Sequence, residues 1–107
     1  MASTPEYVQF VCEQVAPAGE IRTRKMFGEY MVYVNDKPLL LVCDNTVYIR
    51  IHDAISPFMA DAQRGLPYVG AKEHYVLDIE NAQHAVNVIT TLEPLVPIPT
   101  PRKKKAK

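Results

Sequence analysis

The chain has 107 residues, of which 48% are hydrophobic and 22% are charged. This length and balance exclude a disordered chain and favour a single globular domain. The apolar runs are far shorter than the ~20 residues of a membrane-spanning helix, and the N-terminus has no basic segment followed by an apolar one. We therefore expect a cytoplasmic domain that does not associate with membranes.

The net charge of zero hides an asymmetry between the body of the chain and its C-terminal end. Five of the 12 basic residues lie in the last six positions, which leaves seven against all 12 acidic residues, a body charge of about −5. The basic residues of this tail are Arg102, Lys103, Lys104, Lys105 and Lys107. We expect the acidic body to lack the basic stripe that a DNA-reading face carries.

The first predicted element is a helix over residues 4–16. Thr4 suits the N-cap position, and Pro5 suits the first helical position, where its missing N–H costs nothing. Apolar residues recur along the segment at the spacing of one helix face. The sequence therefore predicts an amphipathic helix at the start of the chain.

Strands are predicted from residue 21 to residue 51. This part of the chain is rich in β-branched and aromatic residues, and the turn sequences Asn35-Asp36-Lys37 and Asp44-Asn45 separate its apolar runs. Turns this short join antiparallel neighbours. We therefore predict a meander of about four strands, the first of them over residues 22–27.

The second half of the sequence alternates between helix and strand. A short helix is predicted over residues 53–64. Asp53 and Ser56 both suit its cap position, and Pro57 favours Ser56. One further strand is predicted over residues 73–79, followed by a last helix over residues 82–93.

These elements predict an α+β fold in which an antiparallel meander is covered on its apolar face by the first and last helices. The order is helix, about four strands, helix, strand, helix. Residues 94–107 are rich in proline and basic at their end, so we expect a disordered tail there. The predicted folded domain is then residues 1–93.

No catalytic or metal-binding pattern stands out in the sequence. The histidines His52, His74 and His84 are not spaced as metal ligands. Cys12 and Cys43 fall at predicted core positions, without a basic neighbour that would lower a thiol pKa. We therefore expect no cofactor, no metal ion and no enzymatic activity.

The most unusual segment spans residues 24–30, where two basic residues precede a Met-Phe pair, a glycine and a glutamate. The glycine indicates a bulge or a tight bend in a strand. The segment is either a core strand with a glycine kink or a binding edge on which charged side chains flank an apolar contact. The residues of this candidate binding segment are Arg24, Lys25, Met26, Phe27, Gly28, Glu29 and Tyr30.

This segment, the strands that follow it through Arg50 and the Gly65-Leu66-Pro67-Tyr68 loop together resemble the N-terminal domain of the TfoX (Sxy) family. The resemblance covers about residues 4–96. In that family an arginine precedes Met-Phe-Gly, and a hairpin leads to a strand that ends in a basic residue. The chain departs from the pattern at its turns, since Asn35-Asp36-Lys37-Pro38 lacks the common hairpin glycine.

The resemblance implies a role but no catalytic residues. Full-length family members regulate natural transformation together with a cyclic-AMP-responsive transcription factor, and they carry a second, helical domain. In this chain we expect a proline-rich basic tail in place of that domain. The resemblance implies a non-enzymatic regulatory module whose partner is a protein, either a transcription factor or a second copy of the chain.

Two alternatives stay open at this point. The basic tail can contact phosphates, which would make the chain a weak nucleic-acid binder, although the tail lacks aromatic residues for stacking on single strands. The second alternative is a small enzyme whose site is assembled from scattered residues such as Glu29, Tyr30, His52 and His74.

Overall fold

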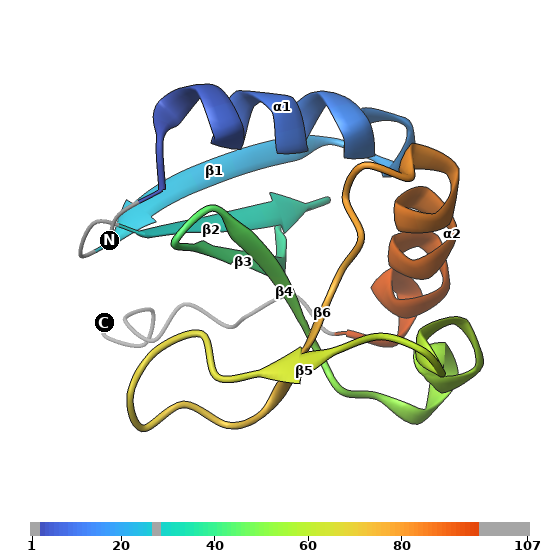
Figure 1. Cartoon of the computed structure of the whole chain (residues 1–107). Coiled ribbons are helices and arrows are strands. Elements are labelled where there is room, and N and C mark those ends of the chain that lie inside the picture. Colours follow the sequence, from blue (N-terminus) through green and yellow to red (C-terminus); the bar gives the residue numbers. More distant parts are fainter. Residues whose placement is uncertain (1–2, 27–28, 97–107) are drawn as a thin grey trace, which may run out of the picture.

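The computed structural model describes residues 3–26 and 29–96 of the chain, and it has helices packed on one face of a sheet (Figure 1). In chain order the elements are α1 (Pro5–Val15), η1 (Ala16–Ala18), β1 (Ile21–Met26), β2 (Glu29–Val34), β3 (Lys37–Cys43), β4 (Thr46–Arg50), η2 (Asp53–Met59), β5 (Arg64–Gly65), β6 (His74–Val76), α2 (Ala82–Leu92) and η3 (Glu93–Leu95), where η denotes a 3-10 helix. The predicted α+β class is confirmed.

The described strands form one antiparallel sheet in the order β1-β2-β3-β4-β6-β5. The central residues of two hairpin turns have positive φ: 53° at Asn35, 67° at Asp36, 52° at Asp44 and 53° at Asn45. Two such residues in succession match the twist of the flanking strands, and asparagine and aspartate tolerate this backbone well. The predicted four-stranded meander is confirmed, and β1 is left as an edge strand.

Both α-helices begin at the expected caps. The Thr4 hydroxyl accepts a hydrogen bond of 3.1 Å from the backbone N–H of Tyr7 at the start of α1. The Asn81 side chain accepts one of 3.1 Å from the backbone N–H of His84 at the start of α2. In each case the side chain satisfies an N–H that has no partner within the helix.

The segment after β4 differs from the prediction. Its helix is a 3-10 helix that ends at Met59, and its cap is His52 rather than Ser56, because Nδ1 of His52 accepts a 3.0 Å hydrogen bond from the N–H of Ala54. Ile55 is fully buried, and its N–H donates to the carbonyl of His52. Packing of Ile55 therefore starts the helix four residues earlier than the proline rule indicated.

One hydrophobic cluster joins the helices to one face of the sheet. Its main members are Val8, Val11 and Val15 of α1, Val32, Val34, Leu40, Val42, Val47 and Ile49 of the strands, Ile55 and Met59 of η2, and Ala85, Val88, Ile89 and Leu92 of α2. The expectation that the first and last helices cover the apolar face is confirmed (Figure 1). Val96 belongs to the same cluster, so the packed body continues past residue 93.

The strand predicted over residues 73–79 is observed as β6 from His74 to Val76, and the N–H of Leu77 donates one further hydrogen bond to β4. Its predicted alternation continues further, since Tyr75, Leu77 and Ile79 are all buried. Within the described ranges, no helix is long and apolar enough to cross a membrane.

Candidate functional site

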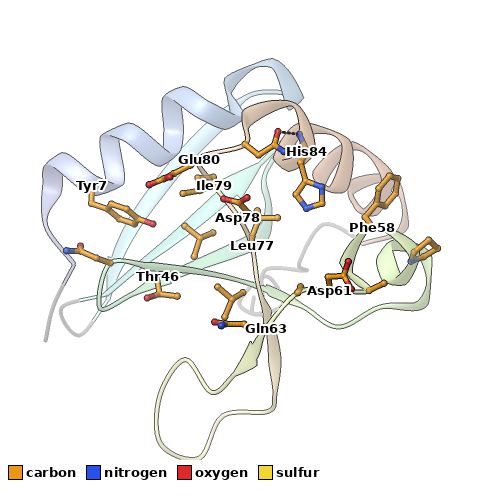
Figure 2. Close-up of a pocket in the computed structure, with 17 residues that line it drawn as sticks. Tyr7, Thr46, Phe58, Asp61, Gln63, Leu77, Asp78, Ile79, Glu80 and His84 are labelled. Atoms are coloured by element: carbon orange, nitrogen blue, oxygen red, sulfur yellow. Dashed lines mark hydrogen bonds between the residues drawn. The ribbon is translucent and has the colours of Figure 1, made fainter.

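A groove of about 650 Å³ opens on the helical side of the molecule, between the start of α1, η2, residues 76–81 and the start of α2 (Figure 2). Its lining residues are Tyr7, Asn45, Thr46, Val47, Pro57, Phe58, Ala60, Asp61, Ala62, Gln63, Val76, Leu77, Asp78, Ile79, Glu80, Asn81 and His84. We call this feature the acidic groove, for the charge described below.

Hydrogen bonds hold the wall formed by residues 77–80 in place. The Gln14 amide donates to the carbonyl of Ile79 at 2.9 Å and to that of Glu80 at 3.4 Å. The N–H of Leu77 donates to a carbonyl of β4 at 2.9 Å. Leu77 and Ile79 are buried, so the alternation of an extended chain leaves Asp78 and Glu80 on the exposed side.

The groove carries negative charge. Asp61, Asp78 and Glu80 line it, and none of its lining residues is a lysine or an arginine. Burial and the nearby Glu80 carboxylate raise the pKa of the Tyr7 hydroxyl. Within residues 3–26 and 29–96, no three His, Cys, Asp or Glu side chains are grouped to hold a metal ion. The arrangement suits the binding of cationic groups with apolar stems.

The opposite face of the sheet, which we call the open face, carries no helix of the described chain. Strand register places one row of side chains across β1 to β4, consisting of Arg24, Met31, Leu41 and Tyr48. Two further pairs lie beside this row, Arg22 with Tyr33 on β1 and β2 and Arg50 with His74 on β4 and β6. An irregularity in the β2–β3 register lies between these two pairs. Arg22 forms an ion pair of 3.4 Å with Asp36 in the β2–β3 turn, whereas Arg24 and Arg50 are exposed.

Contacts on the open face bring rings and guanidinium groups together. The guanidinium carbon of Arg22 lies 4.4 Å from the centroid of the Tyr33 ring, a cation–π geometry. A hollow of about 220 Å³ opens beside Tyr48, Arg50 and His74, and Tyr68 of the loop between β5 and β6 also lines it.

The structure divides the predicted binding segment between the two faces of the sheet. Arg24 and Lys25 are both exposed on β1, but Arg24 lies on the open face, whereas Lys25 pairs with Tyr30 in a row on the covered side. Tyr30 is half-buried and packs against the hydrophobic cluster. Among the described residues of the segment, Arg24 therefore lies on a different face of the sheet from Lys25 and Tyr30.

Glu29, at the start of β2, is engaged in structural contacts. Its carboxylate accepts a 3.2 Å hydrogen bond from the N–H of Asp44 and one of 3.5 Å from the Ser3 hydroxyl. The remaining candidates lie outside the described residues: Phe27, Gly28, Arg102, Lys103, Lys104, Lys105 and Lys107, together with the side chain of Met26.

The thiols are not activated. Burial, with a further contribution from the carboxylates of Glu29 and Asp44, raises the pKa of Cys43 to about 11. Burial and the neighbouring Glu13 raise the pKa of Cys12. A reactive cysteine needs the opposite shift, toward the thiolate.

The four residues considered for an enzyme site do not share either cavity. Of Glu29, Tyr30, His52 and His74, only His74 lines one of them, the hollow of the open face. His52 caps η2, and Tyr30 packs against the core on the other side of the sheet. These positions give no support to a site formed by the four together.

Neither surface is apparent as a motif in the sequence. The alternation Leu77-Asp78-Ile79-Glu80 was a usable signal for two of the groove carboxylates, since it places them on one side of an extended segment. Asp61 had no such signal, because only the packing of η2 brings it to the groove. The rows of the open face depend on strand register, which links residues more than 20 positions apart.

Comparison with known proteins relates the chain to one family. Residues 13–87 match the TfoX N-terminal domain. The chain is also 36% identical, across all of its length and 95% of the relative's, to a protein of Spirochaeta aurantia described as an uncharacterized 12.7 kDa protein in the trpE 5′ region. The matched residues run from α1 to α2 and include most of the lining of the acidic groove. The chain thus belongs to the TfoX N-terminal domain family.

Proposed function

We propose that this chain is a non-enzymatic regulatory module that acts by binding a protein partner at the acidic groove. Membership of the TfoX N-terminal domain family supports a regulatory, competence-related role. The observation that carries the proposal is the combination of exposed apolar side chains with three carboxylates, and with no lysine or arginine, in the lining of a groove of about 650 Å³.

The groove fits a positively charged, extended segment of the partner. Lysine and arginine side chains have apolar stems and charged heads, so their stems can lie against the exposed side chains of Pro57 and Phe58 while their heads pair with the carboxylates of Asp61, Asp78 and Glu80. Segments rich in these residues are common in proteins that bind nucleic acid. This chemistry agrees with a transcription factor as the partner.

A second copy of the chain offers the same chemistry through its own basic tail. Self-association through the edge strand β1 is less favourable, because antiparallel pairing of two β1 strands would bring Arg22, Arg24 and Lys25 of both copies close together. If the protein dimerises, we therefore expect the tail of one copy to lie in the groove of the other.

A cationic probe peptide tests the groove directly. The probe is a fluorescein-labelled peptide with the sequence of residues 97–107, whose five basic residues supply the charge. We expect the triple variant Asp61→Asn, Asp78→Asn, Glu80→Gln to bind it about 10- to 100-fold more weakly at low salt, since each lost ion pair contributes about 0.5–1 kcal/mol. Fluorescence anisotropy measures the affinity.

A matched control carries the same change in net charge at another place. Glu6→Gln, Glu13→Gln, Glu20→Gln removes three exposed carboxylates that do not line the groove, and we expect it to bind the probe within about threefold of the wild type, because screened surface charges act weakly at a distance. Equal losses in both variants, or no binding by the wild type, would reject the groove as the site.

Light scattering after size-exclusion chromatography identifies the partner class. A dimer that the groove variant loses supports binding between copies, whereas a wild-type monomer that binds the probe supports a separate protein partner. A dimer that is lost instead in Phe27→Ala would place the interface at the segment 24–30 and would contradict the groove as the dimer site.

A further inference from the structure

The open face has a charge opposite to that of the acidic groove. Three of the seven basic residues outside the tail, Arg22, Arg24 and Arg50, lie on this face. Arg22 forms a 3.4 Å ion pair with Asp36 of the β2–β3 turn, so Arg24 and Arg50 supply the positive charge of the face. Arg24 and Arg50 are exposed. An acidic protein therefore presents one basic surface, and charge complementarity points to an anionic ligand there.

Planar side chains lie on the same face as these arginines. Tyr48 lies in the middle of the face, and Tyr68 projects from the loop after β5 with 59% of its surface exposed. A third platform is the pair of Arg22 and Tyr33, whose guanidinium and ring are 4.4 Å apart. Tyr33 on β2 and Tyr48 on β4 are separated by two strand spacings, roughly 10 Å across the sheet, so they are far enough apart to contact different planar groups.

The hollow lined by Tyr48 and Tyr68 has room for one ring rather than for a whole cofactor. Its volume is about 220 Å³, below the ~300–1,000 Å³ of typical small-molecule sites. Arg50 and His74 line the hollow and supply its charged and polar groups. Nδ1 of His74 donates a 2.7 Å hydrogen bond to the carbonyl of Lys72, which leaves Nε2 available to a ligand.

We propose that the open face binds single-stranded nucleic acid. Bases stack on Tyr48, on Tyr68 and on the Arg22–Tyr33 pair, and Arg24 and Arg50 contact the phosphates. Aromatic residues on an exposed antiparallel sheet stack unpaired bases in this way, and arginine planes do the same. Duplex DNA is a poorer ligand, because its bases are already stacked and this face offers no helix to enter the major groove. This binding goes beyond the proposed protein partner and uses the other side of the molecule.

Labelled oligonucleotides of about 12 nucleotides test the proposal with the full chain at low salt, where phosphate contacts are strongest. The probes are oligothymidine, oligouridine and a DNA duplex of the same length, measured by fluorescence anisotropy. We expect at least about tenfold tighter binding of the single strands than of the duplex. Comparison of oligothymidine with oligouridine shows whether the face prefers DNA or RNA.

Two matched pairs of variants assign the binding to the open face. Tyr68→Ala should weaken binding about 5- to 100-fold, the usual effect of losing one stacked base, whereas Tyr68→Phe keeps the ring and should stay within about twofold. Arg24→Gln should lower the slope of log affinity against log salt by about one. Lys25→Gln removes the same charge from the next residue of β1, on the covered side, and should change the slope by less than half as much.

A variant in which the five basic residues of the tail are replaced by glutamine distinguishes binding by the tail from binding by the open face. We expect this variant to keep its preference for single strands and its sensitivity to Tyr68→Ala. The proposal is overturned if the tail variant no longer binds, if Tyr68→Ala and Arg24→Gln bind like the wild type, or if duplex binds as tightly as single strand. It is also overturned if polyglutamate competes as well as the oligonucleotides, since the face would then suit an acidic protein. Tyr68 is exposed in a loop, so its variants should fold normally, which circular dichroism verifies.

Discussion

Lys37 and Glu93 are joined twice, by an ion pair and by a hydrogen bond to the backbone. The ammonium nitrogen of Lys37 lies 2.8 Å from the Glu93 carboxylate and donates a 2.8 Å hydrogen bond to the Glu93 carbonyl. The two side chains are only 14% and 20% exposed. The contact ties the start of β3 to the end of α2, where a cation also complements the helix dipole.

Lys37→Met should therefore lower the free energy of unfolding by about 1–2 kcal/mol, because it leaves a half-buried carboxylate and a carbonyl without their donor. Urea denaturation followed by circular dichroism measures the change. Methionine keeps most of the apolar stem, so the loss reports on the charged group.

The control for this prediction is a solvent-exposed ion pair. Arg22 lies 3.4 Å from the Asp36 carboxylate, and their side chains are 56% and 64% exposed. Asp36→Asn removes this pair and suits the turn backbone, so it should cost less than about 0.5 kcal/mol. A cost equal to that of Lys37→Met would contradict the role assigned to burial.

Thr4 tests how much the first helix depends on its cap. Thr4→Ala removes the acceptor for the N–H of Tyr7 and should destabilise the fold by about 1 kcal/mol. Thr4→Ser retains the hydroxyl and should recover most of the loss. Thermal unfolding compares the three proteins, and equal melting temperatures for alanine and serine would show that the hydrogen bond contributes nothing.

Gly19 directly follows η1 and lies close to Asn35 of the β2–β3 hairpin. It has φ of 155°, and a Cβ placed there would come within 2.7 Å of the side-chain amide of Asn35. That amide accepts a 2.9 Å hydrogen bond from the N–H of Glu20, so the clash would also disturb this contact. Gly19→Ala should destabilise the protein by about 1–3 kcal/mol.

Gly70 is the matched control for this prediction, because it has φ of 89° but nothing within 4 Å of an added Cβ. Gly70→Ala should cost about 1 kcal/mol, the backbone penalty alone. If the two alanine variants are equally stable in chemical denaturation, the close approach to Asn35 has no energetic effect.

Because of the Cys43 thiol, we expect the folded protein to lose stability in alkaline solution. Its pKa is raised from about 9 to about 11, so between these values the folded state holds a proton that the unfolded chain has released. Unfolding is then increasingly favoured as the pH rises through this window. The decline should be smaller in Cys43→Ala, as measured by urea midpoints at about pH 8 and about pH 10.5. An identical decline in both proteins would assign it to other groups.

Elements governed by neighbouring residues were predicted well. The caps Thr4 and Asn81 and the Asn-Asp and Asp-Asn turns lie where the sequence placed them, because a cap or a tight turn depends on contacts within about four residues. The helix η2 begins at Asp53, the first residue of the predicted range 53–64, but its cap was predicted wrongly, since it is His52. There the burial of Ile55 outweighs the local preference of Pro57 for the first helical turn.

The sequence by itself determined the α+β class, the order of the main elements and which side chains of each strand are apolar, since these follow from periodicity and turn chemistry. Only the tertiary structure decided which side chains of distant strands and helices share a surface. The register of three strand pairs places Arg24 in the same row as Tyr48. The packing of η2 brings Asp61 into the same groove as Asp78 and Glu80. The physical reason is that periodicity assigns each residue to a face of its own element, whereas the two binding surfaces are formed by how those faces pack together.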